Sequence, residues 1–388
     1  MDTGVQLAKW GLHTVVMLSA DESPVAEAVV ISTDSRAETA AEAHLRAKEA
    51  ARRLSGRTVY KKIDSTLRGN IGAELDGVLD GLGLQRALVA PAAPFAGRTT
   101  SDGYHRVHGV LLAESTFARD QLSPATESHL PTLLARQTRR TVGHLPVAVV
   151  ERGEQAVIRA LMAEPSAIVA ADAVESRHLS TLALALVHMD ERWLPCGSAG
   201  FAEEWARASG LRKPPQARLC WSPDARPVLV VAGSRHPATA RQLRRAVADV
   251  DLHCIRLSPA EDEETKVHTA AVPLLRQGRH LALTTTFSEY QGEREVAVAA
   301  MLGRAALWVL AQAEVAGLVV TGGDTARALC RALAATAVHV LDEVQAGVPA
   351  GTLLGGPRNG MRVVSKAGGF GDELAIVQSI QSLQGRLT

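Results

Sequence analysis

Residues 317–334 read GLVVTGGDTARALCRALA, in which an apolar strand-like run meets a glycine turn and then a helical pattern. The run 317–321 is short and rich in β-branched residues, whereas 324–334 has the spacing of a helix. A strand, a glycine turn and a helix N-terminus in succession present backbone N–H groups that can bind phosphate. Glycine at such a junction is also common as a plain tight turn. This stretch alone therefore leaves both interpretations open.

Two more junctions of this kind lie in the second half of the chain. The run 228–231 leads into AGSRHPAT at 232–239, and the run 361–365 leads into KAGGFGDE at 366–373. The segment GGPRNG at 355–360 adds further glycines. Because ligands bind at the carboxyl ends of parallel strands, we expect these segments to converge on one phosphate-rich ligand. The site is neither a P-loop nor a dinucleotide fold, because GxxxxGK followed by Ser or Thr, and GxGxxG, do not occur.

Strand-like and helical segments alternate along the whole chain, which predicts an α/β fold with mainly parallel sheets flanked by helices. The proline-rich stretch LRKPPQARLCWSPDARP separates two such halves. We predict an N-terminal domain at 1–212, a linker at 213–226 and a C-terminal domain at 227–388, with an active-site cleft between the two domains. The expected strands are 14–18, 28–32, 57–63, 87–90, 147–150, 167–171, 228–231, 254–257, 281–285, 317–321 and 361–365; the expected helices are 38–54, 71–82, 238–250, 293–313, 324–334 and 373–383.

Composition narrows the class of protein. The 388 residues carry a net charge of +1 with no long basic run, which argues against a nucleic-acid partner. No apolar run is long enough to span a bilayer, and the N-terminus lacks the layout of a signal peptide. The four cysteines are scattered without a CxxC pair, as is typical of reduced thiols. We therefore expect a soluble cytoplasmic protein without a membrane partner.

The densest polar block, KKIDSTLRGN at 61–70, follows another strand-like run. Its cations lie beside Asp64, a combination that suits a ligand with both a carboxylate and hydroxyl groups. Upstream, Arg36 in the segment STDSR is a candidate carboxylate clamp, although a helix cap with a solvated arginine explains the same pattern equally well.

Two other reaction classes are disfavoured. His105 and His108 lie three residues apart, but no cysteine or acidic cluster joins them at the spacing of metal ligands, so we assign no metal-binding residue. The segment CGSAG at 196–200 does not satisfy the GxSxG pattern of a hydrolase nucleophile.

Taken in order, these segments resemble the four-carbon acid sugar kinase family, whose members phosphorylate threonate, erythronate or 3-oxo-tetronate with ATP. The resemblance extends over essentially the whole chain, and its most specific motifs are KxDSTLRGN and KxGGFG. It implies an N-terminal domain that binds a sugar acid and a C-terminal domain that binds nucleotide. Its other segments are TDSR, APAAPFAGRTT, HGVLL with TFARD, GSAG, GSRHPATARQ and TGGDT.

The resemblance also implies site residues. On the sugar-acid side it places Arg36, Lys62, Asp64, Ser65 and Arg68. On the ATP side it places Ser234, Gly322, Gly323, Asp324, Thr325, Gly368 and Gly369. Gly97 and Arg98 match a family motif without an assigned role.

The expected reaction is transfer of phosphate from ATP to the terminal 4-hydroxyl of a small sugar acid. Asp64 is the expected catalytic residue and Asp102 an alternative base. Mg²⁺ is expected with ATP, held mainly by phosphate oxygens and water. The motifs do not distinguish among the three acids, and a homo-oligomer remains open.

The chain departs from the family at its start. Members usually begin with a strand and a DDxTGA-like turn, whereas Met1 lies inside that pattern, before the segment DTGVQ. We expect a form lacking this strand to be unstable or poorly active. One alternative is therefore a truncated, non-catalytic relic that binds nucleotide or sugar acid. Another is a dehydrogenase, which the missing dinucleotide fingerprint disfavours.

Overall fold

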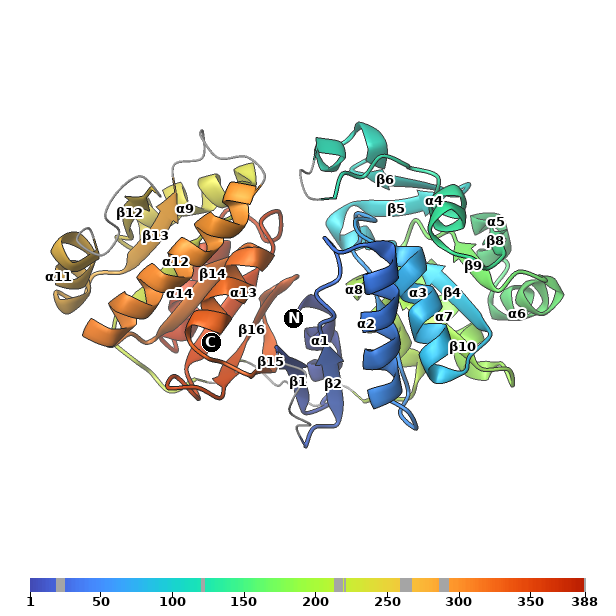
Figure 1. Cartoon of the computed structure of the whole chain (residues 1–388), viewed down its shortest axis with the longest axis horizontal. Helices are drawn as coiled ribbons and strands as arrows, with labels where there is room; N and C mark the ends of the chain where they lie inside the picture. The colour runs from blue at the N-terminus through green and yellow to red at the C-terminus, as the bar shows by residue number, and fades with distance from the viewer. Residues whose placement is uncertain are drawn as a thin grey trace. The chain divides into compact units, whose positions relative to one another are not determined.

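The chain folds into two units that are each compact around their own β-sheet (Figure 1). The N-terminal unit comprises residues 33–212, and the C-terminal unit comprises residues 1–32 together with 213–388. The computed structural model describes residues 1–18, 25–119, 123–212, 219, 221–258, 267–285 and 293–386.

The C-terminal unit is built on a nine-stranded sheet in the order β12-β13-β11-β14-β17-β16-β15-β1-β2. The five strands from β12 to β17 are parallel, β16 and β15 run antiparallel to their neighbours, and β2 is parallel to β1. The strands are β1 (Thr14–Met17), β2 (Ala28–Ile31), β11 (Val228–Ala232), β12 (His253–Leu257), β13 (Leu281–Thr285), β14 (Gly317–Thr321), β15 (Ala337–Gln345), β16 (Val348–Leu354) and β17 (Arg362–Lys366).

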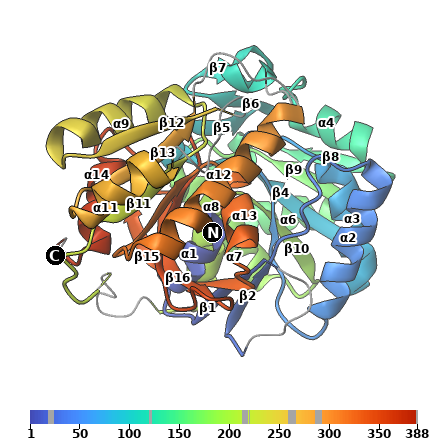
Figure 2. The same cartoon turned by 60° about the vertical axis from the view of Figure 1, so that its left-hand side comes forward.

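Helices cover both faces of this sheet, because the buried strands are apolar on both sides. On one face α12 and α13 lie side by side (Figures 1 and 2), and α1, α11 and the π-helical turn η4 join the same core. On the other face α9 and α14 pack. The helices are α1 (Asp2–Ala8), α9 (Pro237–Asp249), η4 (Val267–Ala271), α11 (Val272–Arg276), α12 (Glu293–Gln312), α13 (Gly323–Ala332) and α14 (Ala375–Leu383).

The N-terminal unit contains a five-stranded parallel sheet, in the order β3-β10-β4-β9-β8, and a small antiparallel sheet of β5, β6 and β7. The strands are β3 (Lys61–Lys62), β4 (Arg86–Ala90), β5 (Arg98–Ser101), β6 (Tyr104–Val107), β7 (Val110–Leu111), β8 (Val142–Leu145), β9 (Ile168–Ala171) and β10 (Trp193–Gly197).

Helices α2, α3 and α4 cover one face of the parallel sheet, and α5 to α8 cover the other. Helices α2 and α3 pack closely because α3 carries Gly77 and Gly81, where a Cβ would overlap or crowd the backbone of α2. The helices are α2 (Ala40–Arg53), α3 (Ile71–Leu82), α4 (Leu130–Gln137), α5 (Val147–Val150), α6 (Glu154–Ala163), α7 (Ser176–His188) and α8 (Ala199–Ala208), with 3-10 turns η1 (Pro94–Ala96), η2 (Leu112–Glu114) and η3 (Thr116–Arg119).

The α/β prediction with mainly parallel sheets is confirmed, but two expected strands are corrected. Residues 147–150 form helix α5, because Pro146 precedes them and their carbonyls close a helical turn. Only Lys61–Lys62 of the expected strand 57–63 pairs with a neighbour.

The compact units also differ from the predicted domains at 1–32, because β1 pairs with β15 in the C-terminal sheet. Half of the expected linker, 213–218 and 220, lies outside the described residues.

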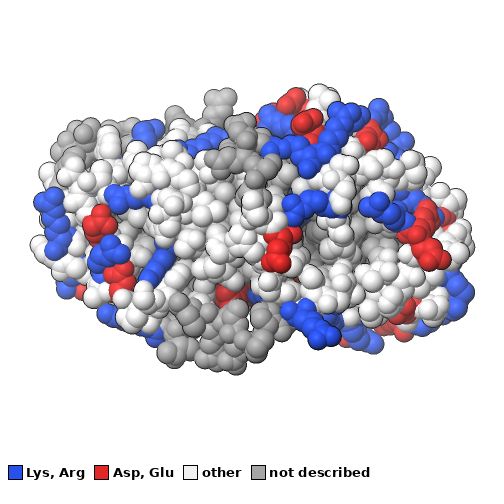
Figure 3. Space-filling view, turned by 90° about the horizontal axis from the view of Figure 1, so that it is seen from below, with Lys and Arg blue, Asp and Glu red and all other residues white. Residues whose placement is uncertain are grey.

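Basic and acidic side chains are interspersed among uncharged ones on the face in Figure 3. In the part of the chain that the structure describes, no helix combines the length and apolarity needed to cross a bilayer.

Candidate active site

Three glycine-bearing turns meet at one edge of the C-terminal sheet. Strands β11, β14 and β17 are neighbours and run parallel, so their carboxyl ends lie together. The segments that follow them begin at Gly233, Gly322 and Ala367. The topology thus brings together the turns that carry Ser234, Gly322 and Gly368.

These turns pack so closely that side chains larger than hydrogen do not fit at two of the glycines. A Cβ on Gly233 would overlap the hydroxyl of Thr325, and one on Gly368 would overlap the hydroxyl of Ser234. Gly322 has φ +97°, a left-handed backbone conformation that favours glycine, and its N–H donates to the carbonyl of Lys366 at 3.0 Å. The glycines therefore allow these turns to pack closely against one another at this edge.

Helix α13 starts directly in this cluster. Its first helical hydrogen bond runs from Ala326 N to Gly322 O, at 3.0 Å, so the N–H groups of the preceding first turn point out of the helix end. Such a turn attracts anions. Gly323 has open space around its Cβ position, and Asp324 is exposed, with Arg327 4.0 Å away. Thr325, in contrast, is buried and packs its hydroxyl against Gly233.

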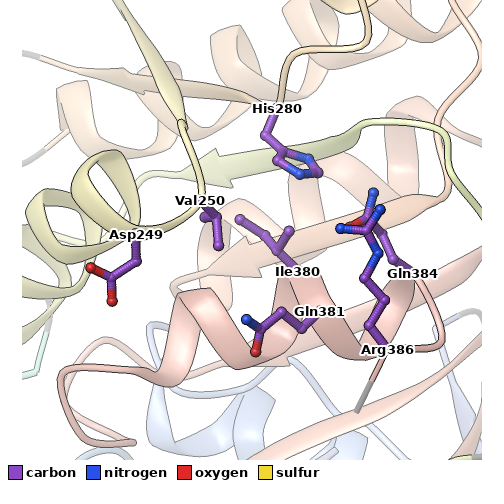
Figure 4. Close-up of a pocket in the computed structure, with 7 residues that line it drawn as sticks. All are labelled: Asp249, Val250, His280, Ile380, Gln381, Gln384 and Arg386. Carbon is purple, nitrogen blue, oxygen red and sulfur yellow. The ribbon is translucent and has the colours of Figure 1, made fainter.

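The glycines of 355–360 do not join this cluster. They form the turn between β16 and β17, and therefore lie at the amino end of β17. A pocket of about 350 Å³ is likewise at the far edge of the sheet, between the end of α9, the start of β13 and the end of α14 (Figure 4). The expectation that every glycine segment converges is thus wrong for 355–360.

The polar block of the N-terminal unit forms a charged cluster around Asp64. The Asp64 carboxylate accepts hydrogen bonds from Arg68 Nε at 2.6 Å and from Thr66 Oγ1 at 2.8 Å. Arg36 contributes a second guanidinium, 3.9 Å from the same carboxylate oxygen. The structure therefore brings Arg36, Asp64 and Arg68 together, although Arg36 lies on a separate segment.

The electrostatics of this cluster favour an ionised Asp64. Burial alone would raise the pKa of the carboxyl, but the charges of Arg68, Arg36 and Lys62 outweigh it and hold the pKa well below its ordinary value. Guanidinium and ammonium groups gathered at one place, as with Arg36, Arg68 and Lys62, suit a ligand that carries a carboxylate. The same low pKa makes Asp64 a weak proton acceptor.

A buried histidine supports the block from beneath. His105 is fully buried; its Nε2 donates to the carbonyl of Ser65 at 2.8 Å, and its Nδ1 accepts from the Thr100 hydroxyl at 2.9 Å. Burial lowers the pKa of His105 to about 4, so the ring is neutral at physiological pH. Both ring nitrogens are engaged, which removes His105 as a metal ligand. Among the described residues, no group of three His, Cys, Asp or Glu side chains is placed to hold a metal.

The segment CGSAG has a structural role. Ser198 caps α8 by accepting from Gly200 N at 3.2 Å, and its hydroxyl donates to the carbonyl of Ala92 at 2.8 Å. Burial raises the pKa of the Cys196 thiol to about 12, which makes it a poor nucleophile.

Sequence reasoning missed the role of one residue beside the Asp64 cluster and left the roles of others open. In the N-terminal unit the Phe117 ring lies under the guanidinium groups of Arg68 and Arg98, at 5.4 and 6.0 Å. Asp102 lies in the β5–β6 turn, where its N–H donates to the buried carboxylate of Asp172 at 2.7 Å. In the C-terminal unit Lys366 lies beneath the Gly368 turn. Arg98, Lys366 and Phe117 all stand in segments that resemble the family, but nothing in the sequence signals that the Phe117 ring stacks on arginine.

Comparison with known proteins identifies the family. Residues 1–205 match the family described as a sugar-binding N-terminal domain, and residues 229–376 match a nucleotide-binding C-terminal domain. The D-threonate kinase of Salmonella typhimurium is 36% identical to the chain, covering 99% of this chain and 95% of the relative. The chain belongs to the four-carbon acid sugar kinase family. The resemblance seen in the sequence motifs is therefore confirmed.

Two other members of this family show the range of acceptors among the relatives. The D-erythronate kinase of Heliobacterium modesticaldum is 33% identical, covering 98% of this chain and 94% of the relative. The 3-oxo-tetronate kinase of Methylobacterium radiotolerans is 32% identical, covering 95% of this chain and 93% of the relative.

Solved structures agree on the fold. A Salmonella typhimurium protein described as a putative tRNA synthase superposes with a TM-score of 0.80 at 25% identity, covering 97% of this chain and 95% of its own. A Haemophilus influenzae protein superposes with a TM-score of 0.73 at 24% identity, covering 100% of this chain and 97% of its own.

Proposed function

We propose that the protein is an ATP-dependent kinase that phosphorylates the terminal 4-hydroxyl of a four-carbon sugar acid. The observation that carries the proposal is that one member of this family contains two candidate sites. One is a cluster of Arg36, Lys62 and Arg68 around Asp64, and the other is a set of glycine turns at the carboxyl ends of β11, β14 and β17.

In the acceptor site, the guanidinium groups of Arg36 and Arg68 bind the carboxylate of the sugar acid, assisted by Lys62. A guanidinium suits this task because its planar N–H groups match a carboxylate. Asp64 fixes Arg68 through their 2.6 Å hydrogen bond and accepts hydrogen bonds from substrate hydroxyls. Ser65, whose carbonyl is held by His105, presents its own hydroxyl to the same substrate.

In the nucleotide site, the residues present fit a phosphate chain. The first-turn N–H groups of α13, from Gly323 to Thr325, and the turn of Gly368 and Gly369 bind phosphate oxygens, with Ser234 between them. Mg²⁺ enters with ATP as part of the co-substrate, and the exposed carboxylate of Asp324 contacts its water shell. Transfer of this kind depends on positioning and on charge neutralisation more than on a strong base. Asp64 therefore serves as the catalytic residue despite its low basicity.

The test is a coupled assay of ADP release with D-threonate, L-threonate, D-erythronate and 3-oxo-tetronate as acceptors. We expect one acid to give a kcat/KM well above the others, and ³¹P NMR of the product to show a phosphate monoester at the 4-position. A reaction without acceptor, and one with the Arg68→Ala variant, serve as controls. ADP release that no acid stimulates would contradict the proposal.

A further inference from the structure

Lys366, the last residue of β17, is a buried lysine. Its side chain is 1% exposed, and Nζ donates to the carbonyl of Gly368 at 3.1 Å and lies 3.5 Å from Thr239 Oγ1. Among the described residues no carboxylate lies within ion-pair distance of Nζ. A buried ammonium group without a counter-charge is costly. This cost suggests that an anion comes to the site.

The hydrogen bonds of Lys366 fix the orientation of one peptide. The Gly368 carbonyl accepts from Lys366 Nζ and from Thr239 Oγ1, both at 3.1 Å. A trans peptide is planar, and its N–H points opposite to its carbonyl. The N–H of Gly369 is therefore turned away from Lys366. Within the described residues this N–H donates to no protein acceptor.

The rest of the turn is held in the same way. Gln242 of α9 donates its Nε2 to the carbonyls of Phe370, Gly371 and Asp372, at 3.1, 3.1 and 2.8 Å. Helix α9 thus holds this turn in place through hydrogen bonds to the carbonyl groups of the turn. The buried Gln242 Oε1 and Thr321 Oγ1 have no hydrogen-bond partner in the described structure, and Thr321 is the register partner of Lys366 on β14. Beneath the glycine turn there is therefore a polar layer that the protein alone does not satisfy.

We propose that Lys366 is a positioning residue of the nucleotide site, which orients the Gly368–Gly369 peptide and receives its counter-charge from the phosphates of the nucleotide. Binding of nucleotide in alkaline solution is then accompanied by uptake of one proton at Lys366. The inference rests on the proposed function, because it assigns the ligand of the glycine turns to a nucleoside polyphosphate.

The direction of the pH dependence follows from the surroundings of Nζ. Burial lowers the pKa of Lys366 to about 8, and burial is its only cause. The neighbours Thr239 and Gln242 on α9 and Thr321 on β14 carry no charge. Along the chain, Arg362 lies four residues before Lys366, and Asp372 and Glu373 follow it, Glu373 pairing with Arg241 at 3.8 Å. The titratable side chain that faces the turn from α9 is His236, whose ring packs against Gly369. Phosphate near Nζ raises the pKa. Affinity is therefore highest where Lys366 is already protonated and falls as the pH rises above about 8.

The experiment is isothermal titration calorimetry with ADP at pH 7.0 and 8.5, each in two buffers that differ in ionisation enthalpy. At pH 8.5 the phosphates of ADP are fully ionised and histidines, which ordinarily titrate near 6.5, are silent. The wild-type protein should take up at least about half a proton per ADP at pH 8.5 and much less at pH 7.0. Lys366→Met should show no such uptake and bind ADP about 10- to 100-fold more weakly. Lys366→Arg keeps the charge and should bind without proton uptake.

Thermal unfolding of each variant separates a folding defect from a binding defect. A purely structural role for Lys366 would leave the proton count of the wild-type protein at zero, so that count decides the question even if a variant fails to fold. Equal ADP affinity of wild-type protein and Lys366→Met, or wild-type binding without proton uptake at pH 8.5, would overturn the inference alone. Absence of ADP binding to the wild-type protein at either pH would overturn the proposed function as well.

Discussion

One candidate site is built mainly from charged side chains, and the other mainly from backbone. The cluster around Asp64 in the N-terminal unit consists of charged side chains held by hydrogen bonds, with a neutral histidine beneath it. The turns around Gly368 in the C-terminal unit consist mainly of backbone. Their glycines are packed so closely against neighbouring atoms that Gly233 and Gly368 could not carry side chains. The first site should therefore be most sensitive to loss of charge and to acid, and the second to added bulk.

The largest effect is expected from bulk at the glycine turns. Gly368→Val should weaken ADP binding by at least about 100-fold, because its Cβ overlaps the Ser234 hydroxyl and displaces a turn that offers several hydrogen bonds of about 1.5–3 kcal/mol each. Calorimetric titration with ADP measures this loss.

The matched control is Gly360→Ala, at the amino end of β17 and outside the nucleotide site, where a Cβ meets no atom within 4 Å; its φ of +82° makes alanine costly for stability but not for ADP binding. It should bind ADP within about threefold of the wild-type protein. If both variants lost ADP affinity to a similar extent, the close packing at Gly368 would not explain why glycine is needed there.

Acid should destabilise the fold around the Asp64 cluster, because it favours protonation of the buried His105. The pKa of this buried ring is about 4, against about 6.5 in the unfolded chain, so the unfolded state binds the extra proton. Stability is complete above pH 6.5 and is lost as the pH falls from about 6.5 towards about 4, by about 3 kcal/mol.

Urea unfolding at pH 7.0, 5.5 and 4.5 measures this loss. In His105→Gln, which keeps a donor for the Ser65 carbonyl, the slope over this range should be smaller. If wild-type protein and variant lost stability in parallel, other groups would be responsible.

Loss of one charge from the Asp64 cluster should act on the acceptor. Arg68→Ala is expected to lower kcat/KM for the sugar acid about 10- to 100-fold, mainly through KM, while ADP affinity stays unchanged. Steady-state kinetics measures both parameters, and Arg53→Ala, an exposed arginine at the end of α2, is the control. Unchanged KM and kcat/KM in Arg68→Ala would mean that the carboxylate binds elsewhere.

The smallest effect is expected from Asp324, a charged side chain in the otherwise backbone-built site. Asp324→Asn should weaken binding of MgADP by about three- to tenfold, because the carboxylate contacts the water shell of the ion. Binding of ADP in EDTA should be unchanged or slightly tighter, since a negative charge is removed from the phosphate site. Equal effects with and without Mg²⁺ would exclude this role.

Local patterns predicted much of the fold. The helix 71–82 and the strands 281–285 and 317–321 agree with the structure residue for residue, because each is a strongly periodic or fully buried run. The hairpin of β15 and β16, which mixes polar and apolar residues, was not expected, and neither was strand β10, which contains a proline. Pairing partners decide such strands, and a local pattern does not reveal them.

Local sequence patterns likewise predicted only part of the candidate sites. Glycine turns could be predicted to converge because parallel strands bring their carboxyl ends together. The contribution of His105 could not, because it depends on a carbonyl 40 residues away in the chain. Lys366 stood in a recognised motif, but its burial and its missing counter-charge are visible only once α9 packs over it.

The pairing of β1 with β15 has a consequence for the order in which the chain folds. The N-terminal unit is one continuous stretch and can complete its core while the rest is still being synthesised. Residues 1–32 belong to a sheet whose matching strand, β15, begins only at Ala337 and is made after the whole N-terminal unit. Until β15 is made, their apolar strands, Thr14–Met17 and Ala28–Ile31, lack this pairing partner. We therefore expect chaperones that recognise apolar segments to bind these strands during synthesis.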